Sequence, residues 1–418
     1  MLYEAIKIDP NYLEAYDELA LICEKKSENA FNSGNITEFQ QQEKIKINYW
    51  GKMVEICPNY RNFFYSMQLG DYYFGKRDFI AAKPFYQTIL ASPNAYKKDE
   101  RYAYDRIQDI DTYIQLLKDT VPFVPKKVEG PSTDDDEYLP MLSPDNRYLF
   151  FTRKMSNEKK IAFEGGYQEL FVKSTKTTGN DFSGGVPMPS PFNLGQYQGG
   201  VSISVNNKLI FITLVEVIPY HGKNRAGFGQ LFDNADIYYS EFINDEWSKL
   251  QSIGSNINTA NTWEAQPSIT SDNKTLYFTR VVDPFGGDMD IYKSERQPDG
   301  SWGDPINLGA PVNTPGDEKS PFMHSDSYTL YFSSNYHIGL GGYDIFYSKM
   351  DEKSGQFKKP INIGNPINTP KDEHGFIVSK DGDRAYYGSS QENKDLNIFS
   401  FELYEEARPK TVAFVNGE

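Results

Sequence analysis

The chain has 418 residues, of which 39% are hydrophobic and 15% aromatic, and its formal net charge is −15. This length predicts at least two domains, and an acidic balance without a basic stripe argues against nucleic-acid binding. No stretch approaches the roughly 18 consecutive apolar residues of a membrane-spanning helix.

Residues 1–120 are predicted to form an α-helical repeat domain, because they are rich in Glu, Lys, Gln, Ala and Leu and lack the alternation of strands. Leu69-Gly70, Tyr73, Ala82 and Tyr86 follow the small and large positions of a tetratricopeptide repeat, which this stretch resembles. Gly70 and Ala82 would let two antiparallel helices approach each other. A scaffold or docking role is expected for this domain, with peptide binding in a groove as the alternative.

Cys23 and Cys57 both lie in this helical region and are predicted to be small buried residues, not a disulfide. Two thiols leave the redox compartment undecided. Met1 opens directly into predicted helix, without the basic and apolar segments of a signal peptide. We therefore expect an export signal or lipid anchor to lie outside this chain.

The next region repeats one pattern five times, at intervals of roughly 55 to 65 residues. Each copy joins an apolar run to an alternating aromatic run through a polar turn, which is the signature of a β-hairpin. The copies are DEYLPMLSPDNRYLFFTR (136–153), YQGGVSISVNNKLIFIT (197–213), WEAQPSITSDNKTLYFTR (263–280), DEKSPFMHSDSYTLYFSS (317–334) and DEHGFIVSKDGDRAYYGSS (372–390).

A third strand and the start of a fourth follow each hairpin, as in DIYKS (290–294) and the tail LGAPVNT (308–314). Four strands repeated five times predict a five-bladed β-propeller over residues 121–404. The fifth copy lacks a fourth strand, so Pro122–Glu129 is predicted to close the ring as the outer strand of that blade. A simple linker is the alternative for this segment.

One residue position next to the first strand of each repeat is acidic or amide. Glu137, Gln198, Glu264, Glu318 and Glu373 occupy it, and they are expected to form a ring at one mouth of the propeller channel. Such a ring would attract a cation such as calcium or a basic side chain of a partner. The favoured interpretation is structural, with each side chain accepting hydrogen bonds from neighbouring turn amides, and binding of a cation or a partner is the alternative.

No catalytic site is predicted. The four histidines are scattered over different repeats, and neither a G-x-S-x-G elbow nor a Cys/His metal motif occurs. Gln297–Trp302 resembles the Asp-box turn of sialidases, but a structural turn explains it as well. The expectation is therefore a protein without enzymatic activity, metal or cofactor, and a sialidase-like glycan-processing enzyme is kept as a remote alternative.

Variable loops on a rigid scaffold commonly carry binding residues. The loop expected from Leu214 to Asp233 is long and contains Tyr220, His221, Arg225 and Phe228. These four side chains are the predicted partner contact. The Gly-Gly pairs that precede the third strands are interpreted as backbone turns, not phosphate loops, because no helix follows them.

The repeat D-E-x-x-P-x-x-S-x-D…L-Y-F-x-S…G-G-x-D-I-Y/F-x-S is most complete in the third and fourth copies. It resembles the WD-like propeller of TolB-type proteins, and with the helical region it is similar to the PorE-like, OmpA-family envelope proteins of the type IX secretion and gliding machinery. The second copy departs from the pattern with Gln198-Gly199, and the fifth has Phe376 in place of proline.

This resemblance implies a periplasmic scaffold, associated with the outer membrane, that docks other secretion proteins. Residues 405–418 would be a linker and the start of a truncated β domain, and a peptidoglycan-binding domain would lie beyond this chain. The alternative is a propeller that senses a ligand or peptide at its channel mouth.

Overall fold

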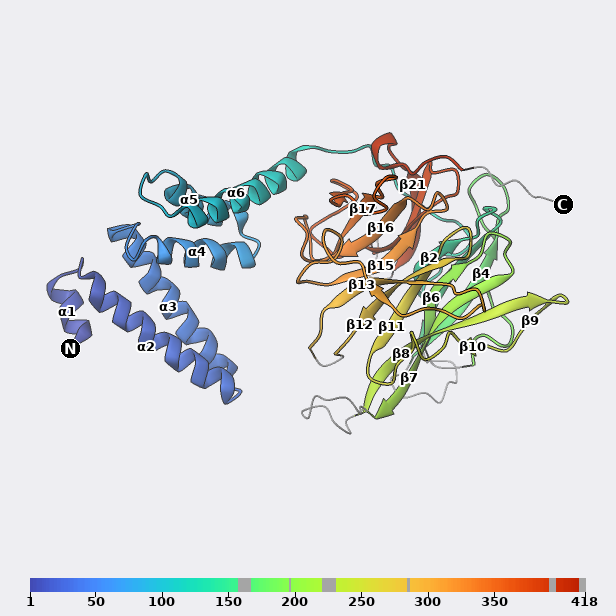
Figure 1. The fold of residues 1–418 in the computed structure, drawn as a ribbon, viewed down its shortest axis with the longest axis horizontal. Coiled ribbons are helices and arrows are strands. Elements are labelled where there is room, and N and C mark those ends of the chain that lie inside the picture. The colour runs from blue at the N-terminus through green and yellow to red at the C-terminus, as the bar shows by residue number, and fades with distance from the viewer. Residues whose placement is uncertain (157–166, 195–196, 220–230, 284–285, 391–395, 413–418) are drawn as a thin grey trace. The chain divides into compact units, whose positions relative to one another are not determined.

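The computed structural model describes residues 1–156, 167–194, 197–219, 231–283, 286–390 and 396–412. The chain divides into two compact units, Met1–Lys118 and Asp119–Glu418. The first unit is helical and the second is built from β-sheets (Figure 1). No helix among the described residues is long and apolar enough to cross a membrane.

Six helices form the first unit, and consecutive long helices pack against each other. They are α1 (Leu2–Ile8), α2 (Leu13–Asn32), α3 (Ile36–Ile56), α4 (Phe64–Gly75), α5 (Phe79–Leu90) and α6 (Lys97–Lys118). Asn35 and Asp78 cap α3 and α5 by accepting hydrogen bonds from backbone N–H groups of the first turn. Helices α2 and α3 have 20 and 21 residues but α4 and α5 have 12 each, so the two helix pairs are not shown to be copies of a tetratricopeptide repeat.

The close approach of α4 and α5 depends on Gly70, as its position in the sequence indicated. A Cβ atom at Gly70 would lie 2.8 Å from the Tyr86 ring, which is fully buried. The Tyr86 hydroxyl donates a hydrogen bond of 2.8 Å to Asp71, which also accepts one from Tyr102 of α6. Gly70 therefore lets a tyrosine fill the helix interface while its hydroxyl stays paired.

Gly70→Val should destabilise the helical unit by about 1–3 kcal/mol or more, because the added methyl groups overlap the buried ring of Tyr86. Gly51→Ala in α3 is the matched control, since nothing lies within 4 Å of a Cβ atom there. That change should raise stability by about 0.5–1 kcal/mol through helix propensity. Thermal melting followed by circular dichroism at 222 nm measures both, and equal melting temperatures for the two variants would contradict the packing argument.

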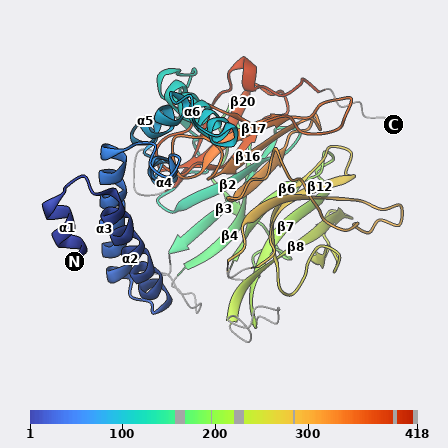
Figure 2. The same ribbon diagram turned by 60° about the vertical axis from the view of Figure 1, so that its left-hand side comes forward.

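The second unit is a five-bladed propeller of antiparallel sheets, in which four blades have four strands each and the second blade has five. Figure 2 shows β2, β3 and β4 of blade 1 side by side. The strands are β2 (Asp136–Leu142), β3 (Tyr148–Ser156), β4 (Tyr167–Thr175) and β5 (Val186–Pro187) in blade 1; β6 (Tyr197–Ile203), β7 (Leu209–Pro219), β8 (Leu231–Ile243), β9 (Glu246–Trp247) and β10 (Gln251–Ser252) in blade 2; β11 (Trp263–Ile269), β12 (Thr275–Val281), β13 (Met289–Glu295) and β14 (Ile306–Asn307) in blade 3; β15 (Glu318–Met323), β16 (Thr329–Ser334), β17 (Asp344–Lys349) and β18 (Ile361–Asn362) in blade 4; and β19 (His374–Val378), β20 (Arg384–Ser389) and β21 (Asn397–Glu402) in blade 5.

Blade 5 is completed by β1 (Lys126–Lys127), which comes from the beginning of the propeller sequence. Lys126 pairs with Ser400 and Lys127 with Phe399 in an antiparallel register. The Glu137 N–H also donates to the Leu396 carbonyl oxygen, which joins blade 1 to blade 5 a second time. The predicted closure of the ring is confirmed, although only two residues of the expected segment form the strand.

The segment after β21 packs on the propeller instead of leaving it. Ala407 is fully buried in the short 3-10 helix η2 (Glu405–Ala407), and its carbonyl oxygen accepts a hydrogen bond of 2.6 Å from the buried Tyr331 hydroxyl. Farther on, the Lys410 N–H donates to Asp326 of blade 4 at 2.9 Å. We call residues 404–410 the strap, because they tie the end of blade 5 back to blade 4.

Candidate functional site

The side chains predicted to form the acidic ring are all buried in the structure. Glu137, Glu264 and Glu318 have no exposed surface, and Gln198 and Glu373 are 2% and 6% exposed. Each accepts a hydrogen bond from the backbone N–H of a residue four or five positions earlier. These donors are Thr133, Asn193, Thr259, Thr314 and Thr369.

Glu318 illustrates the arrangement. Its Oε2 accepts from the Thr314 N–H at 2.8 Å, and its Oε1 accepts from the hydroxyls of Thr314 at 2.7 Å and Ser334 at 2.6 Å. Thr314 belongs to the connection that arrives from blade 3, whereas Ser334 ends the second strand of blade 4. One carboxylate therefore holds an incoming connection against its own blade, and Glu373 repeats the contacts with Thr369 in blade 5.

The blades differ in how this buried charge is compensated. Arg153 Nε lies 2.8 Å from Glu137, and Arg280 Nε lies 3.0 Å from Glu264. Gln198 is neutral and needs no counter-ion. Among the described residues, no lysine or arginine forms a comparable ion pair with Glu318 or Glu373.

Burial raises the pKa of Glu264, Glu318 and Glu373 to about 7, because desolvation disfavours the charged carboxylate. Hydrogen bonds from threonine hydroxyls and amides oppose this shift in all three. A nearby carboxylate adds to the shift at each site: Asp236 for Glu264, Asp290 for Glu318 and Asp344 for Glu373. These side chains therefore change charge near neutral pH inside the blade junctions.

No group of three or more His, Cys, Asp or Glu side chains is arranged to hold a metal ion in the part of the chain that the structure describes. The binding of calcium or of a basic partner side chain by the acidic ring stays a prediction. In the structure, the five side chains accept hydrogen bonds that hold each connection from the preceding segment against the blade that follows it.

A β-bulge interrupts the innermost strand of every blade two residues after the buried Glu or Gln. The residue at the bulge has a left-handed backbone, with φ between 50° and 69°. Leu139, Gly200, Gln266, Ser320 and Gly375 occupy these five positions. Gln266 joins two blades, because its Oε1 accepts from the Thr279 hydroxyl at 3.1 Å and from the Ser320 N–H of blade 4 at 2.7 Å.

The channel that the innermost strands surround is largely filled by side chains. Phe322 of β15 packs against three of the hydrophobic clusters of the propeller. A cavity of about 40 Å³ lies at the bulges, and one of about 50 Å³ lies at the ends of the innermost strands. Each cavity has room for water molecules.

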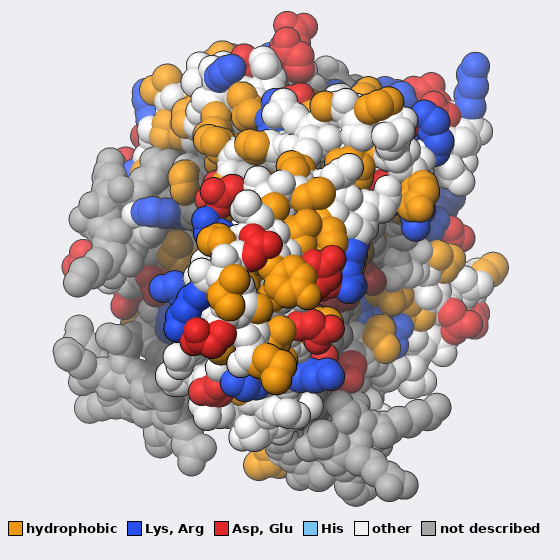
Figure 3. All heavy atoms as spheres, turned by 90° about the vertical axis from the view of Figure 1, so that its left-hand side faces the viewer, with side chains coloured by type: hydrophobic (Ala, Val, Ile, Leu, Met, Phe, Trp, Pro, Cys, Tyr) orange, Lys and Arg blue, Asp and Glu red, His pale blue; other side chains and the backbone are white. Residues whose placement is uncertain are grey.

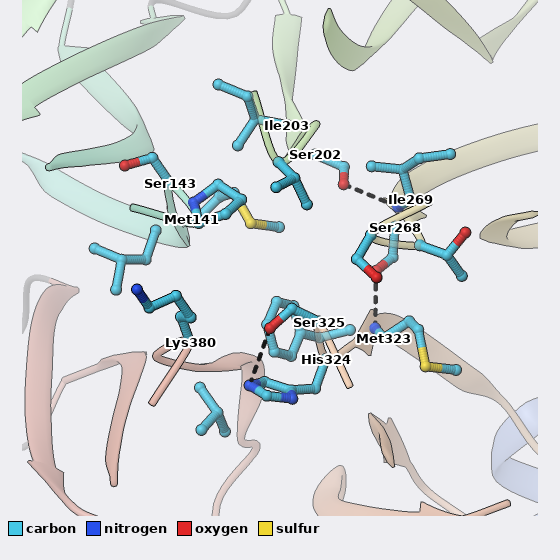
Figure 4. A pocket seen from close by; sticks show the side chains of 17 residues that line it. Met141, Ser143, Ser202, Ile203, Ser268, Ile269, Met323, His324, Ser325 and Lys380 are labelled. Atoms are coloured by element: carbon cyan, nitrogen blue, oxygen red, sulfur yellow. Dashed lines mark hydrogen bonds between the residues drawn. The ribbon is translucent and has the colours of Figure 1, made fainter. Parts of the chain in front are cut away.

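Figure 4 shows the second cavity, where all five blades contribute side chains. Ser202 Oγ accepts from the Ile269 N–H at 3.0 Å, and Ser268 Oγ accepts from the Met323 N–H at 2.8 Å. The same serine position thus links blade 2 to blade 3 and blade 3 to blade 4. Lys380 of blade 5 completes the lining on the opposite side (Figure 4).

His324 lines this cavity but is occupied by structural hydrogen bonds. Its Nδ1 accepts from the Asp326 N–H at 3.1 Å, which makes Nε2 the protonated nitrogen, and Nε2 lies 3.1 Å from the Ser379 carbonyl oxygen of blade 5. The other four blades carry serine or threonine here: Ser143, Ser204, Thr270 and Ser379. His324 therefore links blades 4 and 5 at a position where the other blades use a hydroxyl to stabilise a turn.

The predicted partner contact, Tyr220, His221, Arg225 and Phe228, lies outside the described residues. We predicted a loop from Leu214 to Asp233. The residues on either side of this predicted contact form strands instead. Residues 214–219 belong to β7 and residues 231–233 to β8, and the two strands pair as far as Pro219 and Leu231. β-branched residues such as Val215, Val217 and Ile218 favour this extended conformation.

Sequence analysis did not single out Lys319, whose ammonium group lies 3.4 Å from the centre of the Tyr343 ring. The Tyr343 hydroxyl donates to Asp317 at 2.7 Å, and its N–H donates to Asp372 of the next blade connection at 2.9 Å. Burial lowers the pKa of Lys319, and the carboxylates of Asp372 and Asp317 oppose that shift. The other blades place Tyr, Gly, Ala and His at this position. The sequence signal that could have identified Lys319 is therefore the variation of this position within an otherwise repeated strand.

Comparisons with solved structures found several proteins that are similar to this chain. The chain is similar to TolB from Acinetobacter baumannii (15% identity, TM-score 0.36), with coverage of 65% of this chain and 55% of that one. It is also similar to a thermostable family-43 glycoside hydrolase (14% identity, TM-score 0.44; 69% and 98% covered) and to a Trypanosoma rangeli sialidase (9% identity, TM-score 0.40; 67% and 60% covered). No family model and no curated protein matches the sequence.

The expectation that the protein is not an enzyme was wrong as stated. Glycosidases and sialidases are among the solved structures similar to this chain. The absence of familiar motifs in the sequence therefore does not exclude catalysis, because one fold supports both binding proteins and enzymes. At these identities the similarity establishes the propeller fold alone.

Proposed function

We propose that this chain is a protein-binding scaffold of the cell envelope that docks components of the type IX secretion and gliding machinery. The observation that carries the proposal is the set of large apolar side chains left exposed on the helical unit. Figure 3 shows a face of the molecule on which hydrophobic side chains gather between acidic and basic ones. The exposed set on the longer helices comprises Leu21, Ile22, Phe31, Ile36, Phe64, Ile80, Leu90, Tyr104 and Leu117.

Exposed apolar groups of this kind favour association with another protein, because their burial removes apolar surface from water. Side-chain hydrogen bonds join neighbouring blades of the propeller, so the propeller is itself a rigid scaffold for protein contacts. The resemblance of the repeats to those of OmpA-family envelope proteins supports a periplasmic location near the outer membrane and other secretion proteins as partners. The small cavities of the channel favour binding by outer surfaces over ligand sensing inside the channel.

Affinity capture from an envelope extract tests this function, with the immobilised chain as bait and quantitative mass spectrometry as the readout. We expect a secretion-machinery protein to be enriched by the wild type and lost from the variant Ile80→Asp/Tyr104→Asp. These side chains are 69% and 49% exposed, so the changes should leave the fold intact. Val124→Asp, at a 75% exposed residue of the propeller, is the matched control. Equal enrichment by all three proteins would contradict the proposal.

Glycan processing stays open as an alternative and has a direct test. A panel of fluorogenic glycosides, sialosides included, can be incubated with the purified chain. Saturable turnover that follows the protein through purification would replace the scaffold proposal with an enzymatic one. Absence of turnover together with partner-specific capture is the result that the scaffold proposal predicts.

A further inference from the structure

Strands β7 and β8 extend beyond the rest of their blade. They have 11 and 13 residues, whereas the second and third strands of the other blades have six to nine. The last pair between β6 and β7 is Tyr197 with Val215, but β7 and β8 stay paired for four more residues, to Pro219 and Leu231. Figure 1 shows the two strands running on together past the other strands of the blade. We call residues 215–219 and 231–235 the β-arm.

One face of the β-arm is apolar and exposed. Directly opposed residues of an antiparallel pair point to the same face, so Val217 shares its face with Asp233, and Pro219 shares it with Leu231. Val217 is 60% exposed and Leu231 is 63% exposed. Phe232 and Asn234 on the other face of the β-arm are buried, so the face with Val217 and Leu231 is the one that exposes apolar surface.

Among the described residues, no strand pairs with the β7 edge of the β-arm beyond Val215. Strand β6 ends its pairing at Val215, and β10 pairs with Tyr238 and Tyr239, beyond the arm. An uncovered strand edge presents backbone N–H and C=O groups to any extended segment. Natural edges are often protected by lysine, and neither β7 nor β8 contains lysine or arginine.

The charge of these strands selects among occupants. Their ionisable acids are Glu216, Asp233, Asp236 and Glu241, and no basic residue balances them within the two strands. A second copy of the arm would bring like charges together, and the whole chain carries a net charge of −15. A basic segment with alternating apolar residues would complement both the charge and the apolar face.

We propose that the β-arm binds an extended, basic segment of a partner protein by adding it as a further β-strand. Backbone hydrogen bonds to the arm edge provide the affinity, and alternate apolar side chains of the partner cover Val217 and Leu231. On the opposite face of the added strand, lysine or arginine side chains of the partner meet Glu216. This inference rests on the proposed role in protein binding and names the chemistry of one partner site.

Fluorescence polarisation with synthetic peptides tests the inference. The probe is a labelled nine-residue peptide in which lysine alternates with valine, and the comparison peptide alternates glutamate with valine. We expect saturable binding of the basic peptide to the wild type, at least tenfold weaker binding of the acidic one, and weakening as salt rises from 50 to 300 mM. A basic peptide that is N-methylated on alternate backbone amides should lose binding in one of its two registers, because strand addition needs those N–H groups.

Val217→Lys/Leu231→Lys should weaken the basic peptide at least tenfold, since it removes the apolar contacts and adds repulsion. Val282→Lys/Ile306→Lys is the matched control, at residues of blade 3 that are 59% and 51% exposed. Unchanged binding by the arm variant, or insensitivity to N-methylation, would overturn the inference. Arm-dependent dimers in analytical ultracentrifugation would overturn the choice of partner. If the wild type does not bind the peptide but the helical unit still captures its partner, the proposed function stands and the inference about the β-arm fails. If the wild type binds the peptide but captures no partner, the inference stands and the proposed function fails.

Discussion

Truncation of the chain after Leu403 should lower the melting temperature of the propeller strongly relative to a chain that ends at Thr411. The shorter chain loses the strap, so the buried hydroxyl of Tyr331 loses its acceptor on Ala407, and Ile363 loses the hydrogen bond of 2.9 Å from Tyr404. Unpaired buried polar groups cost about 1–3 kcal/mol each. We expect a total loss of about 4 kcal/mol or more, which is on the order of 10 °C for a domain of this size.

Differential scanning calorimetry of both truncated chains measures this effect. Tyr331→Phe serves as the test of cause, because it removes the same hydrogen bond without shortening the chain. The substitution should destabilise the chain that ends at Thr411 by about 1–2 kcal/mol and have little further effect on the one that ends at Leu403. Equal melting temperatures for the two truncated chains would show that the strap does not stabilise blades 4 and 5.

Ionisation of Glu318 and Glu373 should make the propeller less stable as the pH rises from about 4.5 to 8. The pKa of Glu318 and Glu373 is about 7 in the folded state, above the ordinary value of about 4.3 in an unfolded chain. The folded state therefore binds more protons than the unfolded state between these values, and its stability falls as the pH rises through the folded pKa. Each group contributes up to about 3 kcal/mol to this loss.

Glu318→Gln/Glu373→Gln tests the assignment, because glutamine imitates the protonated acid. The variant should unfold at nearly the same denaturant concentration as the wild type near pH 4.5 and at a higher one at pH 8. Burial lowers the pKa of His374 to about 4. Its effect on stability has the opposite sign below pH 6.5, but the wild type and the variant share it, so the difference between the two proteins isolates the two carboxyl groups.

Glu137→Gln is the contrasting variant. Arg153 lies 2.8 Å from Glu137, and its side chain is only 11% exposed. Removal of one partner leaves a buried cation unpaired, which should cost about 3–5 kcal/mol at every pH in the window. A pH dependence identical in wild type and Glu318→Gln/Glu373→Gln would show that these carboxylates do not titrate near neutral pH.

The repeats allowed the propeller to be predicted in detail. Alternating aromatic runs and polar turns located four strands in each blade, and the missing fourth strand of the last copy correctly assigned residues before Asp136 to blade 5. Repetition also identified the position of Glu137 and its equivalents as special. It could not predict which way those side chains point, because a shift of one residue moves a strand side chain to the other face. The β-bulge at Leu139 and its equivalents adds a local change of direction that only the backbone shows.

Features that occur once were harder to predict. The sequence of the β-arm predicts a loop, because polar residues such as Asn234 and a proline at Pro219 interrupt the apolar alternation. The sequence of the strap predicts a linker because Glu405 and Glu406 are charged, whereas Ala407 is buried and Tyr404 packs against the core of blades 4 and 5. Such contacts join residues far apart in the sequence, and composition does not reveal them.

Site-specific photo-crosslinking in cells of the source organism tests most directly whether outer surfaces carry recognition. A photoreactive amino acid can replace Ile80 of α5, Val217 of the β-arm or Ser325 at the channel cavity, one at a time. The account predicts adducts with other envelope proteins from Ile80 and Val217 and none from Ser325. Adducts from Ser325 alone would contradict it and place recognition at the channel.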